Sequence, residues 1–154
     1  MQRLAVVNHE DFIKRAYVLA RKAAANGDHP FSALLVNSGR IVLECLNTVN
    51  TNKDATRHPE LDILRLASTS DTCFPFDQTV LYASTEPCAM CSGAIYWSGI
   101  PTLVYGCSAK TLGEIAGGSF VVPSRDLFSK GKRDIEIIGP VLPDQGADIH
   151  RDFW

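Results

Sequence analysis

Apolar positions recur at helical spacing near the beginning of the chain. Residues three or four apart, with one adjacent pair, define the stripe: Phe12, Ala16, Leu19, Ala20 and Ala23. This spacing predicts an amphipathic helix with one buried face. Asn8 is a suitable N-cap residue, and Asn26-Gly27 is a typical helix end. The first element is therefore expected to be a helix between these two signals.

The pattern changes to short apolar runs after this helix. "FSALLVN" (31–37) and "RIVLECLN" (40–47) are joined by Ser38-Gly39, which predicts a β-hairpin. The polar stretch 48–57 is expected to be a loop. Helical spacing returns in 58–68, where Pro59 suits the first turn and Ile63, Leu64 and Ala67 form a stripe.

The second half of the chain alternates strands and helices. We expect strands at "TVLYAST" (79–85), "TLVYGCS" (102–108) and 134–142, a helix over 88–99 that ends at Gly99, and a final helix after Pro143. Strands separated by helices favour parallel neighbours with helices on both faces. The predicted fold class is therefore α/β, a three-layer α/β/α sandwich with a five-stranded mixed sheet. No linker or repeat interrupts the pattern, so residues 1–154 are expected to form one domain.

Composition narrows the class of protein. The 154 residues are 45% hydrophobic and 21% charged, and no apolar run approaches the roughly 18 residues that a membrane span requires. The first residues lack a secretory signal pattern, so we expect a cytoplasmic protein without a membrane partner. The formal net charge of −2 argues against a strongly basic nucleic-acid-binding protein. Five cysteines without framework-like spacing agree with a reducing compartment.

The segment "TEPCAMC" (85–91) places two cysteines three positions apart at the beginning of a predicted helix. The helix dipole lowers the pKa of thiols there and favours the thiolate form that binds metals. His58 begins the preceding predicted helix, and sites in open α/β sheets form at the carboxyl ends of strands. We therefore expect His58, Cys88 and Cys91 to converge as ligands of one Zn²⁺ per chain.

Two sulfur ligands and one nitrogen ligand, without an obvious fourth, are typical of a catalytic zinc that retains a bound water. Cys45 and Cys107 lie in apolar strand runs, where a free cysteine is usually a small buried apolar residue. The alternative is a structural-zinc interaction module, in which Cys107 would supply the fourth ligand.

Glu60 distinguishes the two hypotheses. Helical residues two positions apart point in different directions, so Glu60 is expected to work beside the metal rather than to bind it. A carboxylate there can take the proton of an activated water and pass it to a leaving group. His58-Pro59-Glu60 followed by Pro87-Cys88-Ala89-Met90-Cys91 matches H-x-E and P-C-x-x-C, the signature of zinc deaminases.

On these motifs the chain resembles the cytidine/deoxycytidylate deaminase superfamily over nearly its whole length. The resemblance implies a cytidine deaminase-like fold and hydrolytic release of ammonia from a base, with Glu60 as the catalytic proton shuttle. Pro59 departs from the small residue usual in the middle of H-x-E. The resemblance also implies a homodimer paired through helices near the zinc.

Three features resemble guanine and guanosine deaminases: Phe31 in "HPFSALLV", Trp97 in "SGAIYWSG" and the terminal Trp154. Together with Asn47, which matches a base-binding asparagine, these are the expected substrate-binding residues. The most favoured substrate is a small-molecule purine base or nucleoside. "EPCAMCSGA" and "AKT…AGG" are close to tRNA adenosine deaminases, and Gly99-Ile100-Pro101 is similar to cytosine deaminases, so both alternatives stay open.

Three polar side chains are expected to have no part in the chemistry. We expect His9 and His150 to be solvated, and Glu86 to be a surface charge at the end of a strand or a residue that supports the metal ligands. Trp154 is expected to be either a disordered end or a residue that closes a pocket.

Overall fold

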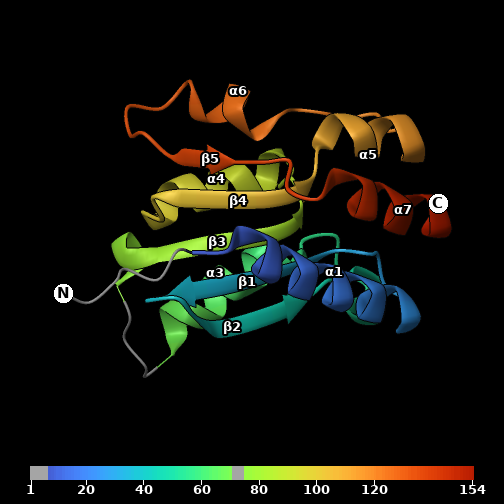
Figure 1. The fold of residues 1–154 in the computed structure, drawn as a ribbon, viewed down its shortest axis with the longest axis horizontal. Coiled ribbons are helices and arrows are strands. Elements are labelled where there is room, and N and C mark those ends of the chain that lie inside the picture. Colours follow the sequence, from blue (N-terminus) through green and yellow to red (C-terminus); the bar gives the residue numbers. More distant parts are fainter. Residues whose placement is uncertain (1–6, 71–74) are drawn as a thin grey trace.

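Five strands form one mixed sheet in the order β2-β1-β3-β4-β5, in a computed structural model that describes residues 7–70 and 75–154 (Figure 1). The strands are β1 (Ser32–Asn37), β2 (Arg40–Leu46), β3 (Thr79–Thr85), β4 (Thr102–Cys107) and β5 (Glu136–Ile138). The α/β class with a five-stranded mixed sheet is confirmed. The last strand is shorter than the predicted 134–142.

Strand directions differ between the two halves of the sheet. β1 is antiparallel to both β2 and β3, whereas β3, β4 and β5 are mutually parallel. The predicted hairpin is confirmed, and its turn residues Ser38 and Gly39 both have the positive φ that tight hairpin turns require. Among neighbouring strands, only β3, β4 and β5 run parallel. β2 and β3 are not neighbours, because β1 lies between them and runs in the opposite direction.

Helices cover both faces of the sheet and its carboxyl edge. They are α1 (His9–Ala25), α2 (Val49–Asn52), α3 (Pro59–Thr69), α4 (Ala89–Ser98), α5 (Ala109–Ala116), α6 (Ser124–Phe128) and α7 (Pro143–Phe153), with a 3₁₀ turn η1 (Phe76–Gln78). In Figure 1, α1 and α7 lie in front of the sheet, and α3 and α4 lie behind it. The stretch 48–57 is not wholly a loop as expected, because it contains α2. No helix within the described ranges has the length and hydropathy of a membrane span.

Two apolar clusters hold these layers together. Alternate residues of β1 point to opposite faces, so Leu34 packs with α1 while Leu35 packs with α3 and α4. Ile63 of α3 and Ile95 of α4 are fully buried in the second cluster. Burial of such side chains stabilises the fold by about 1.5–3 kcal/mol each. The packing therefore fixes α3 and α4 relative to the sheet and to each other.

The reversed direction of β1 brings four strand ends to one edge of the sheet. Ser32 at the start of β1 pairs with Leu46 at the end of β2, and Thr85 at the end of β3 pairs with Cys107 at the end of β4. The segments that flank these residues therefore meet at a single edge.

Tyr17 of α1 connects the first helix to the last. Its hydroxyl donates to the carbonyl oxygens of Val141 and Leu142, each at 3.0 Å, immediately before α7. A Cβ at Gly146 would lie 2.6 Å from the Tyr17 hydroxyl oxygen, so only glycine permits this approach of α7. Tyr17 thereby helps to set the position of α7 on the sheet.

We expect Tyr17→Phe to lower the free energy of unfolding by about 1 kcal/mol, because the hydroxyl that satisfies these carbonyl groups is lost. Urea unfolding checks this value. Val18→Ala is the matched control, since Val18 is exposed on the same helix and should change stability by less than about 0.5 kcal/mol. Equal stabilities of the two variants would contradict the assignment.

Candidate metal and catalytic site

The three predicted ligands lie at the beginnings of two helices. His58 is the N-cap residue of α3 and Cys88 is the N-cap residue of α4, with Cys91 in the first turn of α4. His58 Nδ1 is 3.7 Å from Cys88 Sγ and 3.5 Å from Cys91 Sγ. All three ligand atoms lie within 4.8 Å of one another, and they form the single group of this kind found in residues 7–70 and 75–154.

These distances fit a tetrahedral zinc site. Zinc–sulfur bonds of about 2.3 Å and zinc–nitrogen bonds of about 2.0–2.1 Å, set at the tetrahedral angle, separate the two ligand atoms by about 3.6 Å. The donor set of one imidazole and two thiols is also one that zinc prefers. His58, Cys88 and Cys91 would therefore hold the ion without rearrangement.

The two other described cysteines do not complete the site. Cys45 and Cys107 are buried and lie outside the ligand group. The Cys107 thiol instead lies 3.6 Å from the carbonyl oxygen of Ser108, to which it donates. Cys73 lies outside the described residues. The structure thus gives no support to Cys107 as the fourth ligand of a structural zinc.

Glu60 lies beside the ligands and is 5% exposed. The Cys91 thiol donates to Glu60 Oε2 at 3.6 Å, and burial raises the pKa of the Glu60 carboxyl to about 7. Hydrogen bonding with Cys91 and with His58 lowers the pKa of the Cys88 thiol to about 4. A carboxyl group whose pKa is near neutrality can both accept and return a proton.

A hollow of about 60 Å³ contains the reactive groups. It is lined by Phe31, His58, Glu60, Glu86, Cys88 and Leu112, and we call it the metal hollow. Phe31 comes from the segment before β1, while Leu112 comes from α5. The metal hollow is thus closed on one side by an aromatic ring and on another by an aliphatic side chain.

Asn47 follows β2 and lies next to Phe31, because its backbone N–H donates to the Phe31 carbonyl at 3.0 Å. Its side-chain oxygen accepts from the backbone N–H groups of His29 and Val49. Its Nδ2 is buried and lacks a hydrogen-bond partner within the described chain. An unpaired buried donor is costly, so this amide is suited to an acceptor supplied by a ligand.

The C-terminal tail folds back onto its own chain. The Trp154 indole N–H donates to His150 Nδ1 at 3.3 Å, and its ring lies 5.3 Å from that of His29. The His150 ring in turn lies 5.4 Å from Phe31. Trp154 therefore reaches the metal hollow indirectly, through His150 and Phe31, and does not line it.

The expectation that His150 is solvated is wrong. His150 is 1% exposed, and its Nε2 lies 2.7 Å from the Thr85 hydroxyl oxygen. Because Nδ1 accepts from Trp154, Nε2 carries the proton and donates to Thr85. Burial lowers the pKa of His150 to about 4, which keeps the ring neutral. His9 is also part-buried, and its Nδ1 lies 2.8 Å from the Tyr82 hydroxyl oxygen.

Trp97 is not brought to the metal hollow of its own chain. It lies near the end of α4 and is 84% exposed. With Tyr96, Leu127 and Phe128 it lines a separate hollow of about 230 Å³ between α4 and α6. The predicted contact of Trp97 with substrate stays a prediction, because Trp97 does not reach the metal hollow of its own chain.

Glu86 is not a surface charge. It is 8% exposed, and its carboxylate accepts from the backbone N–H of Ala109 and from both the N–H and the hydroxyl of Ser124, each at 2.8 Å. These donors are the first residues of α5 and α6. The sequence shows both helix starts, but it does not show that they meet at the end of β3.

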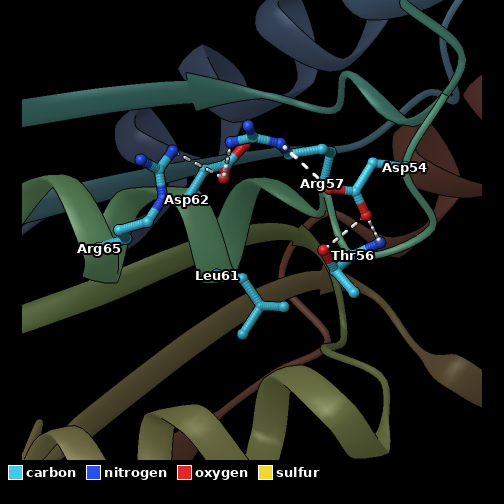
Figure 2. Close-up of a pocket in the computed structure, with 6 residues that line it drawn as sticks. All are labelled: Asp54, Thr56, Arg57, Leu61, Asp62 and Arg65. Atoms are coloured by element: carbon cyan, nitrogen blue, oxygen red, sulfur yellow. Dashed lines mark hydrogen bonds and ion pairs between the residues drawn. The ribbon is translucent and has the colours of Figure 1, made fainter. Parts of the chain in front are cut away.

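Another hollow, of about 470 Å³, lies outside the metal hollow, along the first turns of α3. Figure 2 shows Arg57 between Asp54 and Asp62, with Arg65 also directed at Asp62. The four charges pair with one another, so this hollow offers no unpaired group for chemistry. The pairs instead support the loop that leads into His58.

Comparison with known proteins agrees with this geometry. The cytidine and deoxycytidylate deaminase zinc-binding region matches residues 6–107. A "probable cytosine deaminase" of Schizosaccharomyces pombe is 32% identical over 93% of this chain and 90% of its own length. The tRNA-specific adenosine deaminase 2 of Danio rerio is 36% identical over 94% of this chain and 70% of its own length. The structure of guanine deaminase from Bacillus subtilis is 32% identical, has a TM-score of 0.65 and covers 96% of both chains.

The site thus defines a zinc-dependent aminohydrolase, with an imidazole, two thiols and a buried carboxyl at one sheet edge. The chain belongs to the cytidine and deoxycytidylate deaminase family and is a deaminase of nucleobases or nucleosides. The names of these three relatives give three different substrates, so family membership does not identify the base on which this protein acts.

Purified protein should contain about one zinc per chain by elemental analysis. Cys91→Ser should lose most of the metal because one of three ligands is removed. Cys107→Ser is the matched control and should keep it, since this thiol lies outside the ligand group. Loss of zinc from the Cys107 variant would revive the structural-zinc alternative.

Proposed function

We propose that the protein removes the exocyclic amine of a free purine base or purine nucleoside of the guanine type. The observation that carries this proposal is that Phe31 and Glu60 line the same hollow as the metal ligands His58 and Cys88. An aromatic face there can stack on a planar base. The unpaired Asn47 amide next to Phe31 can donate to an acceptor on that base.

Each residue has a distinct role in the proposed reaction. A zinc ion held by His58, Cys88 and Cys91 would supply Lewis acidity that makes an attacking water nucleophilic near neutral pH. Glu60 accepts a proton from the attacking water and delivers it to the substrate, where the departing amine leaves as ammonia. Phe31 and Asn47 orient the ring. The surrounding apolar walls limit the access of bulk water.

A tRNA substrate is less well supported. Phosphate contacts dominate affinity for nucleic acids and require free cationic side chains. In the basic segment 125–133, the Arg133 guanidinium donates to the backbone carbonyls of Ile95, Tyr96 and Ile100 at the end of α4. The Arg133 guanidinium is therefore held by hydrogen bonds within the fold and is not a free cationic group. Arg125, Lys130 and Lys132 remain, with Asp126 among them, and give a weak electrostatic footprint.

A cytosine substrate is the second candidate. The similarity to the S. pombe relative extends over 93% of this chain, and the small metal hollow is compatible with a single pyrimidine ring. Ammonia release measured over guanine, guanosine, adenine, cytosine and a tRNA anticodon stem separates the candidates. Turnover of guanine or guanosine supports the purine proposal, and turnover confined to cytosine or tRNA refutes it.

Glu60→Gln should retain zinc and lower kcat for ammonia release by about 10²–10⁴, the usual contribution of a positioned general acid–base group. Zinc content and circular dichroism of the variant serve as controls for folding. Glu44→Gln, on the exposed side of β2, is the matched substitution and should leave kcat unchanged. Retained activity in the Glu60 variant would overturn its role.

We also propose a homodimer in which the exposed side of α4 takes part. Met90 and Trp97 are both exposed and lie seven residues apart, so they share one face of this helix. An exposed tryptophan beside an apolar hollow is typical of an interface anchor.

A cytoplasmic setting suits the family's thiolate ligands, because reducing conditions preserve them.

Trp97→Asp should convert the dimer into a monomer, because a charge would have to be buried at the contact. Light scattering with size exclusion measures the mass in solution. Val42→Asp, at an exposed position of the edge strand β2, is the control and should leave the mass unchanged. A monomeric wild-type protein would contradict the proposed dimer.

A further inference from the structure

A second hollow of about 100 Å³ adjoins the metal hollow, and we call it the side pocket. The two share Glu86, Cys88 and Leu112. The side pocket is completed by residues of α5 and of the segment that follows it: Ala109, Gly113, Gly118, Phe120, Val121 and Val122. The two hollows are therefore neighbours at the same edge of the sheet.

The lining of the side pocket offers little to a polar group. Apart from Glu86 and the ligand Cys88, it consists of glycine, alanine and larger apolar residues. The Glu86 carboxylate already accepts three hydrogen bonds, from Ala109 and Ser124. Water needs about 2–4 polar partners to be held firmly, so it gains little here. Transfer of an apolar group from solvent into this space is favourable.

Close packing gives the side pocket a defined shape. Val121 folds back over α5, where a Cβ at Gly113 would lie 2.8 Å from Val121 Cγ2 and one at Gly118 would lie 3.0 Å from the same atom. A side chain at Gly113 would force Val121 to shift, and one at Gly118 would crowd it. Glu86 binds the first residues of α5 and α6, which bracket the 117–123 segment at both ends. The wall is therefore anchored at its ends and packed in its middle.

We propose that the side pocket binds a compact apolar substituent on the ring of the substrate, so that the substrate class includes alkylated purine bases. This inference rests on the proposed function. Its volume exceeds the roughly 10–15 Å³ that one water requires and suits a group of one to a few carbon atoms. A phosphate is disfavoured, because it would meet the Glu86 carboxylate and no cationic side chain among the lining residues.

Matched substrates test the inference. We would measure kcat/KM for ammonia release from guanine and from 1-, 7-, 8- and 9-methylguanine with the zinc-loaded protein. One isomer should exceed guanine by about fourfold, the gain expected from burial of one methylene-sized group. Isomers whose methyl group points elsewhere should be equal to guanine or worse. Failure of every isomer to exceed guanine would overturn the side pocket while leaving guanine turnover intact.

A variant links the preference to the side pocket. Val122→Thr keeps the side-chain shape and adds a hydroxyl group to the lining, so the ratio of kcat/KM for the best isomer over guanine should fall at least twofold. Val18→Thr, on the exposed face of α1, should leave the ratio unchanged. An unchanged ratio in the Val122 variant, with normal zinc content, would contradict the assignment.

The two proposals fail in distinguishable ways. If guanine and all its methyl isomers release no ammonia, the guanine-type assignment is wrong. The same comparison is then made with cytosine against 5-methylcytosine and adenine against 2-methyladenine. If the methylated form of the new base is preferred and Val122→Thr reduces that preference, the side-pocket proposal is supported. If the new base shows no methyl preference, the side-pocket proposal is overturned.

Discussion

The packing of α3 against α4 is the constraint on which the site depends. His58 and Cys88 each stand immediately before one of these helices, so the ligand geometry is set by how the two helices meet. Ile63 and Ile95 fix that meeting within one fully buried cluster. The helix beginnings also contribute electrostatically, because their unpaired N–H groups favour thiolates. Metal binding therefore depends on apolar packing, together with the ion pairs that support the loop before His58.

In the proposed function, the reversed strand β1 places the residues that would recognise the base apart from those that bind the metal. The metal ligands and Glu60 come from α3 and α4, whereas Phe31 and Asn47 come from the two ends of the β1–β2 hairpin. If β1 ran parallel to β3, Phe31 would lie at the opposite edge of the sheet. Because it runs antiparallel, the hairpin brings Phe31 to the hollow that Glu60 lines, and Asn47 donates to the Phe31 carbonyl oxygen. Changes in the hairpin can thus alter the base that is bound without disturbing the metal ligands.

Much of this arrangement could be predicted from the sequence, because periodicity and helix-start signals are local. The layers, the hairpin and the convergence of His58, Cys88 and Cys91 followed from such signals. Three features could not be predicted. Glu86 is buried because two helix starts far along the chain supply its donors, and His150 is buried because α7 packs on the sheet. Trp97 points away from the metal hollow because of the rotation of α4, which spacing alone does not define.

Polar groups around the site divide into those committed to structure and those left free. Glu86 is satisfied by Ala109 and Ser124, His150 by Thr85 and Trp154, and Arg133 by carbonyl groups at the end of α4. Within the described residues, the Asn47 amide nitrogen is the one buried side-chain polar atom without a partner. The metal hollow itself is lined by few polar side chains besides the metal ligands, namely the Glu60 and Glu86 carboxyl groups. Under the proposed function, discrimination among bases would depend largely on the shape of the apolar walls that Phe31, Leu112 and the side pocket provide.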